Sequence, residues 1–496
     1  MNNSCYFMRL LFFLVLVFLG GCCRGNHLEL GIDIAQRQKF SILKKKKVAL
    51  LTHSAAMDSK GKLTLDILAE SNVFQLKAVL LPEHDGGFDD KKLEELKKKK
   101  IDIHCTHTST SRSPQIEWLK DIDIVVADVQ DIGMRYYTYI ASVLYAMAKT
   151  FNAGKEFIIF DRTNPLGDSI GGPIVNEKYV SFLAPVSGSP LRHGMTVGEM
   201  ANYIKNRGEN FEVKCDCGMK KCDHGIFCDK ATLKKGKLTI VKVKGWNRKK
   251  DLTETGSYKE DSKIYFSPWI KNVASIFDYA TLSFSVLLAS SSIDFIDTHK
   301  NPKFPERNFK TFASPHMKSS EILDHLKKRY PESLAGYTLV PTKIERKVAG
   351  KVKTLDGLDL TIKNFSQTKP DFLNLALYSL AQEWVPKCDW EAFEKTIATG
   401  NSTQATAVAP PQPNTVTPIS TRDLKKLTSD QQKGLRKAKW DRITKSQRKL
   451  LQKHIGDDEF LNKLFDGESI DVVYFRNKWD REATSFYNKT KKYYFY

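Results

Sequence analysis

Three carboxylates in the N-terminal half of the chain each follow a short apolar run that is typical of a buried strand: Glu83, Asp128 and Asp161. The carboxyl ends of parallel strands meet at one edge of a sheet, so we expect these side chains to share a cleft. Paired carboxyl groups suit glycoside hydrolysis, because one protonates the leaving oxygen while the other activates water or attacks the anomeric carbon. A helix cap or a surface ion pair is the alternative for each acid taken singly.

The densest polar stretch is residues 123–139. Its first half predicts a strand that is buried on both faces, and apolar residues at helical spacing follow it. Between them lie Asp131, Arg135, Tyr137 and Tyr139. Arginine can bind an anionic ligand group, and tyrosine can bind a ring or a hydroxyl. The stretch therefore predicts a ligand-binding site. The alternative is a helix N-terminus that merely carries acidic residues.

Two later loops add polar candidates. Arg162 and Asn164 follow Asp161, while Arg192 and His193 directly precede a helix that a Thr-x-x-Glu capping box predicts. An arginine fork can bind a substrate carboxylate or merely anchor its own loop. The catalytic candidates are Glu83, Asp128 and Asp131, and the substrate-binding candidates are His84, Arg135, Tyr137, Tyr139, Asp161, Arg162, Asn164, Arg192 and His193.

Alternating strand and helix patterns predict an α/β fold with a Rossmann-like parallel sheet. No G-x-G-x-x-G or P-loop sequence follows these strands, so we expect no nucleotide or other cofactor. We predict five parts: a signal peptide (1–21), a Rossmann-like catalytic domain (22–205), a second α/β domain (206–400), a Pro/Thr-rich linker (401–420) and a basic helical C-terminal module (421–496).

The formal net charge of +21 comes largely from lysine runs. Such runs are usually solvated, and no nucleic-acid motif accompanies them, so no nucleic-acid partner is expected. The apolar run after Arg9 is typical of a signal peptide, and Leu-Gly-Gly-Cys22 resembles a bacterial lipobox. We therefore expect export and acylation of Cys22, which would anchor the protein in the bacterial cell envelope, facing the periplasm. A plain secretory signal is the alternative.

Four cysteines occur within residues 215–228, and His224 lies among them. Their spacing matches no common zinc motif, and an exported protein favours disulfides. We predict local disulfides among Cys215, Cys217, Cys222 and Cys228 and no metal site, with zinc as the alternative.

Several motifs resemble the exo-β-N-acetylmuramidases of the NamZ type, the DUF1343 family. They are Pro-Glu83-His84, the segment 128–139, Asp161-Arg162-Thr-Asn164-Pro-Leu-Gly, Gly-Pro at 172–173 and Arg192-His193-Gly-Met-Thr. The resemblance is strong over about residues 30–201. It implies two α/β domains with a cleft between them, release of terminal N-acetylmuramic acid from peptidoglycan fragments, and Glu83 as the main catalytic carboxylate.

Some positions depart from the family pattern. Asp85 stands where the family has glycine, and residues 297–307 keep almost none of the family's glycine-rich segment. A catalytically inactive, glycan-binding lipoprotein on the same scaffold is therefore the alternative function. The C-terminal module is expected to lie outside the resemblance and to form a small self-packed helical bundle. Binding of envelope polymer or of an unknown partner protein is the alternative.

Overall fold

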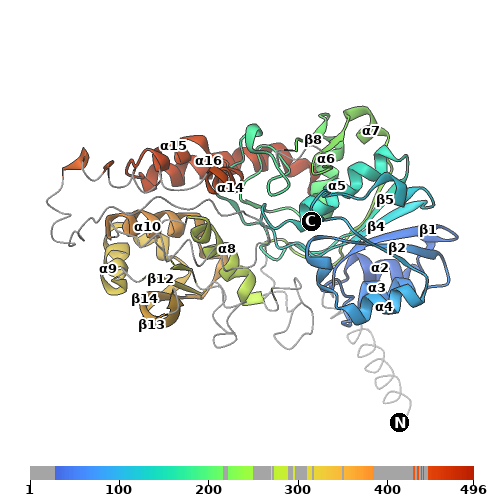
Figure 1. Cartoon of the computed structure of the whole chain (residues 1–496), viewed down its shortest axis with the longest axis horizontal. Helices are drawn as coiled ribbons and strands as arrows, with labels where there is room; N and C mark the ends of the chain where they lie inside the picture. Colours follow the sequence, from blue (N-terminus) through green and yellow to red (C-terminus); the bar gives the residue numbers. More distant parts are fainter. Residues whose placement is uncertain are drawn as a thin grey trace, which may run out of the picture.

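The computed structural model describes residues 28–215, 222–249, 270, 273–288, 294–295, 310–314, 318–348, 351–384 and 445–496, with single residues and pairs between 428 and 440. The signal peptide, Cys22, Cys217 and the linker 401–420 lie outside these residues. Two lobes are evident in Figure 1: the N-terminal half forms one around a sheet, and helices and strands from about residue 273 onward form the other.

The N-terminal domain is built on a parallel sheet of six strands in the order β10-β5-β4-β1-β2-β3. This order, read along the chain, is that of a Rossmann fold, and its direction reverses between β1 and β4. The predicted α/β architecture is thus confirmed. The strands are β1 (Lys47–Thr52), β2 (Gln75–Leu81), β3 (Asp102–Cys105), β4 (Ile124–Asp128), β5 (Glu156–Phe160) and β10 (Leu238–Val241).

Helices cover both faces of this sheet, which explains why its central strands β1, β4 and β5 are mostly apolar. In β1, Val48 and Leu50 pack into one apolar cluster while Ala49 and Leu51 pack into another, as the two-residue period of a strand requires. The helices are α2 (Gly31–Arg37), α3 (Thr64–Ala69), α4 (Asp90–Lys98), α5 (Tyr139–Asn152), α6 (Val197–Asn206) and α7 (Lys230–Lys235). The predicted capping box begins α6 through Thr196 and Glu199.

The second domain has an antiparallel sheet in the order β11-β12-β14-β13, and helices α8, α9 and α10 pack with it. Its long hairpin pairs Tyr337 with Ile362 and continues in register to Val348 and Lys351. The elements are α8 (Val273–Leu288), β11 (Asp294–Phe295), β12 (Thr311–Ser314), α9 (Ser319–Arg329), β13 (Tyr337–Val348), β14 (Lys351–Ile362) and α10 (Pro370–Trp384).

The C-terminal helices α14 (Lys445–Ile455), α15 (Asp458–Phe465) and α16 (Val472–Thr490) belong to the same lobe. Trp440, Phe460 and Trp479 share one buried apolar cluster with Phe277 of α8 and Leu373 of α10. The described part of the segment 421–496, which the sequence suggested as a separate module, therefore packs into the core of the second domain.

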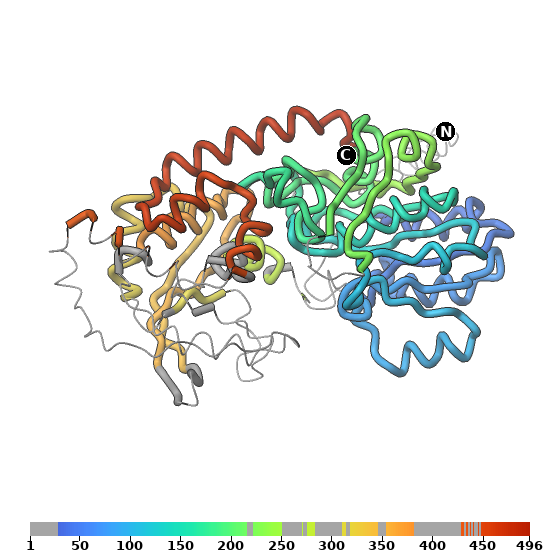
Figure 2. The backbone as a smooth tube through the Cα atoms, turned by 45° about the horizontal axis from the view of Figure 1, so that its top comes forward, coloured from blue at the N-terminus to red at the C-terminus, as the bar shows by residue number. Residues whose placement is uncertain are grey.

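Helix α16 also joins the two domains. Figure 2 shows it running from the second domain across to the N-terminal domain, where the end of the chain docks. The hydroxyl of Tyr496 donates to Asp161 Oδ2 (2.8 Å), and the amide of Phe495 donates to Glu199 Oε1 (2.7 Å). The last residues of the chain thus complete the edge of the Rossmann sheet where β5 ends.

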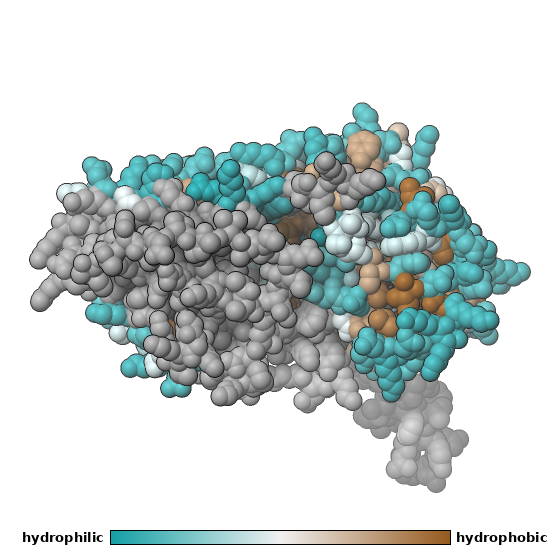
Figure 3. Space-filling view, viewed as in Figure 1, coloured by the Kyte–Doolittle hydropathy of each residue, from teal (hydrophilic) through white to brown (hydrophobic). Residues whose placement is uncertain are grey.

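The described part of the visible surface is mostly hydrophilic, with small apolar areas over the N-terminal domain (Figure 3). No helix among the described residues combines the length and the apolar character needed to cross a membrane.

Candidate active site

A cavity of about 320 Å³ opens where the two domains meet. The N-terminal domain supplies most of its wall, and α14 of the second domain supplies one lysine. The lining residues are Glu83, His107, Arg112, Thr138, Ser181, Phe182, Leu183, Lys214, Cys215, His224 and Lys453. Among these described residues Glu83 is the sole carboxylate.

Glu83 begins a short 3₁₀ segment, η2 (Glu83–Gly87), directly after β2. Its side chain is about a quarter exposed, and Thr138, at the N-cap of α5, donates its hydroxyl to Oε2 (2.5 Å). The Nε2 atoms of His107 and His84 lie 3.5 Å and 3.9 Å from Oε1. The carboxyl is thus held by a fixed donor and flanked by imidazoles.

The backbone after Glu83 is strained. His84, Asp85 and Gly86 have φ values of 60°, 53° and 61°, which is the left-handed region. This conformation costs a residue with a Cβ roughly 1–2 kcal/mol. Two contacts hold it: Cys105 Sγ donates to Asp85 Oδ1 (2.7 Å), and the amide of Ser54 donates to the carbonyl of Gly86 (2.8 Å). Strain of this kind gathers at functional sites, which supports a role for Glu83.

The cavity is positively charged overall. Arg112, Lys214 and Lys453 face the single carboxylate, and burial lowers the pKa of His107 to about 4, so that this imidazole is neutral at pH 7. Such a cavity favours a ligand that carries a negative charge. The sequence reasoning missed these three cations, because they come from two loops and a distant helix with no shared motif.

Most of the other predicted site residues lie at the carboxyl edge of the sheet but outside the cavity lining. Asp128 is fully buried in an ion pair with Arg162, whose Nη2 donates to Oδ2 (2.9 Å). Thr64 donates its hydroxyl to the same oxygen (2.5 Å). A buried charge pair of this kind needs all its partners, so the geometry gives both side chains a structural role.

Asp131 and Asp161 are also buried and bonded within the protein. Asp131 Oδ2 lies 3.4 Å from His193 Nε2. Asp161 accepts hydrogen bonds from the hydroxyls of Thr196 and Tyr496 and from the amide of Gly198. Burial raises the pKa of Asp161 to about 6.

Two of the predicted anion receptors join the domains instead. Arg135 is buried and donates to four backbone carbonyls, two of which (those of His454 and Ile455) end α14. Arg192 forms a bidentate pair with Asp371 of α10, with both N–O distances at 2.7 Å. Each guanidinium therefore fixes the second domain against the first.

The remaining candidates pack around these pairs. Tyr139 stacks on the ring of His53 at 4.7 Å, and Tyr137 meets Tyr279 of α8 edge-on at 6.0 Å. Asn164 donates to the carbonyl of Met195. Of the predicted site residues, the structure therefore places Glu83 in the cavity lining, while His84 lies beside its carboxyl group but outside that lining. The three acidic strand ends do not converge there, because β1 separates β2 from β4.

The cysteine-rich loop borders the same cavity. The sulfurs of Cys215 and Cys222 lie 2.8 Å apart, while Cys228 is buried in the core of the N-terminal domain. Cys217 lies outside the described residues, and the disulfide pairing stays a prediction.

Fold and cavity together define a two-domain α/β protein, with a Rossmann-like domain and a glutamate-bearing cavity at the domain junction. Residues 48–271 match the family model described as "Exo-beta-N-acetylmuramidase NamZ, N-terminal", and residues 304–496 match the corresponding C-terminal model. The chain belongs to the NamZ family. Because the second match reaches residue 496, the expectation that the C-terminal helices lie outside the resemblance is wrong.

A curated relative and two solved structures agree with this placement. The chain is 30% identical over 309 residues to the peptidoglycan β-N-acetylmuramidase NamZ of Bacillus subtilis (strain 168), a match that covers 60% of this chain and 64% of that relative. Two crystal structures of DUF1343 family proteins from Bacteroides fragilis NCTC 9343 share the fold. Their TM-scores are 0.67 and 0.54 at 23% and 19% identity, each covering 95% of this chain and 99% of its own.

Proposed function

We propose that this protein is an exo-acting glycoside hydrolase that releases terminal N-acetylmuramic acid from peptidoglycan fragments, with Glu83 as the general acid. The observation that carries the proposal is the placement of Glu83. It is the one carboxylate among the described lining residues of an otherwise cationic cavity between the domains. The family membership supports the reaction class.

The chemistry follows from the position of the glutamate. A protonated Glu83 carboxyl donates its proton to the glycosidic oxygen as the bond to the anomeric carbon breaks, and water supplies the hydroxyl of the released sugar. Thr138 fixes the orientation of the carboxyl through its 2.5 Å hydrogen bond to Oε2. A fixed donor geometry lowers the barrier, because less reorganisation is needed in the transition state.

The cations match the distinguishing group of the substrate. N-acetylmuramic acid carries a lactyl carboxylate, which Arg112, Lys214 and Lys453 would bind. These residues replace Arg135, Arg162 and Arg192 as the proposed receptor, because those three guanidiniums lie outside the cavity lining. Arg112 lies within it, although its Nη1 also donates to the carbonyl of Ser111.

The size of the cavity supports action at a chain end. Its volume of about 320 Å³ is at the small end of ligand sites, which span roughly 300–1,000 Å³. It therefore suits one terminal sugar better than an internal stretch of glycan. Export and a lipid anchor at Cys22 would place the enzyme where peptidoglycan is turned over. Replacing Cys22 with alanine and asking whether the protein leaves the membrane fraction tests that part.

Glu83→Gln tests the assignment of the acid. We expect turnover of a chromogenic N-acetylmuramic acid glycoside to fall by roughly 10²–10⁴-fold, the usual contribution of a general acid. Glu94→Gln, on the exposed face of α4, is the matched control and should keep wild-type activity. Equal turnover in wild type and Glu83→Gln would remove Glu83 from the mechanism. Saturable sugar binding without turnover in the wild type would favour the inactive, glycan-binding alternative.

A further inference from the structure

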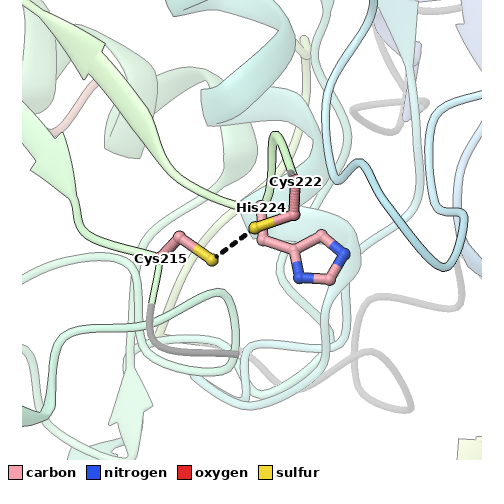
Figure 4. Close-up of side chains that lie close together, drawn as sticks. All are labelled: Cys215, Cys222 and His224. Atoms are coloured by element: carbon pink, nitrogen blue, oxygen red, sulfur yellow. Dashed lines mark hydrogen bonds between the residues drawn. The ribbon is translucent and has the colours of Figure 1, made fainter. Parts of the chain in front are cut away.

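Three metal-ligating side chains meet at the base of a hairpin beside the cavity. The hairpin joins β8 (Phe211–Val213) to β9 (Ile226–Cys228); Cys215 follows its first strand, and Cys222 and His224 precede its second. One ligand atom of each side chain lies within 4.8 Å of the other two. Figure 4 shows the two sulfurs facing each other with the imidazole ring next to them.

The imidazole of His224 completes the set of three donors. Its Nε2 atom is buried and has no hydrogen-bond partner among the described residues. Either ring nitrogen of a neutral histidine can bind a metal ion while the other donates a hydrogen bond.

The chemistry of the three ligand atoms favours one class of metal ion. Two thiolates and one imidazole suit zinc or another borderline-soft transition ion, whereas calcium and magnesium prefer oxygen ligands. Zinc–sulfur bonds of about 2.3 Å in a tetrahedral site place two sulfurs about 3.8 Å apart, so binding would open the present 2.8 Å separation by about 1 Å.

We propose that Cys215, Cys222 and His224 bind one zinc-type ion through three protein ligands, with the fourth position open to solvent. Cys215, His224 and Lys214 are also part of the wall around Glu83. The ion would therefore fix this wall and the lysine that it carries. The expected effect of the ion on catalysis rests on the proposed function. The metal-binding proposal does not, because metal binding is measured separately.

The test compares the metal content of full-length wild type, Cys222→Ser and His224→Asn after purification under reducing conditions. We expect one zinc per chain in the wild type and less than a tenth of that in either variant. Cobalt substitution of the wild type should give the thiolate-to-cobalt absorption band, and both variants should lack it. Cys228→Ala is the matched control and should retain the ion, because its sulfur lies in the apolar core.

Two outcomes would overturn the proposal. One is a Cys215–Cys222 disulfide, found by mass spectrometry, in a chain that takes up no zinc even after reduction. The other is an equal zinc content in the wild type and both variants. With the ion removed, we expect the KM for the sugar substrate to rise about threefold to tenfold while kcat changes less. Zinc binding in a protein without turnover would leave this inference standing and reject the proposed function.

Discussion

At the scale of single residues, the Glu83 side chain is held by a neighbour that the sequence did not single out. Thr138 is the last residue of the polar loop after β4, and its hydroxyl donates a hydrogen bond to the Glu83 carboxylate. This hydroxyl, and not a pair of acids, therefore links the segment after β2 to the loop after β4. The carboxylates once expected to be partners lie in buried pairs instead, because a charge removed from water must be matched by a counter-charge and hydrogen bonds.

Thr138→Val should lower kcat/KM by roughly tenfold to a hundredfold, since a hydrogen bond to a charged group contributes about 1.5–3 kcal/mol. Thr138→Ser keeps the hydroxyl and should stay within a few-fold of wild type. Steady-state kinetics on both variants check this expectation. If valine and serine behaved alike, the hydrogen bond would have no part in catalysis.

At the scale of secondary-structure elements, salt bridges position the second domain. Arg192 lies in the short strand β7 (Arg192–His193), and its pair with Asp371 ties this strand to α10. Arg135 ties the polar loop after β4 to the end of α14. Because α14 also carries Lys453, these contacts determine where one wall of the cavity lies.

Asp371→Asn should lower the free energy of unfolding by about 3–5 kcal/mol, because it leaves the Arg192 charge buried without its partner. Chemical denaturation measures the effect. Lys62→Met breaks an exposed pair with Glu70 and should leave the stability close to that of wild type. A loss no larger in Asp371→Asn than in this control would mean that the interdomain pair is dispensable.

The sequence predicted where strands and helices lie along the chain, but not which of them lie side by side in the fold. Apolar runs located β1, β2, β4 and β5, and the Thr196–Glu199 box located the start of α6. Strand order is a tertiary property, however, so nothing local revealed that β1 separates the end of β2 from that of β4. Nor could local patterns reveal that Lys453, far along the chain, reaches the cavity near Glu83.

At the scale of the whole molecule, the C-terminal residues pack against the N-terminal domain. Helix α16 contacts both domains, and the hydroxyl of Tyr496 donates to Asp161 next to the end of β5. The carboxyl edge of the sheet, where many Rossmann-like proteins bind ligands, is partly filled by these contacts. The cavity lies at the same edge, beyond the carboxyl end of β2 and next to the cysteine-rich hairpin.

Folding also buries His53 at the point where the order of the sheet reverses. Burial, with a contribution from Arg162, lowers the pKa of His53 to about 3. The unfolded chain binds a proton near pH 6.5 while the folded chain does not, so stability falls as the pH drops below that value.

Between pH 7 and pH 5 we expect this one group to remove about 2 kcal/mol from the free energy of unfolding. In His53→Gln the loss over the same interval should be smaller by that amount, as denaturation at both pH values would show. Asp161 acts in the opposite direction, because its raised pKa adds stability as the pH falls through about 6, and it does so equally in both proteins. Identical pH dependence in the two proteins would contradict the buried, neutral imidazole.

The most direct test of the central claim is a crystal structure of Glu83→Gln with a bound β-N-acetylmuramic acid glycoside. We predict that the sugar occupies the cavity with its glycosidic oxygen within hydrogen-bonding distance of residue 83. Its lactyl carboxylate should lie among Arg112, Lys214 and Lys453. A sugar bound against Asp128 and Asp161 instead, or one whose glycosidic oxygen points away from residue 83, would contradict the account.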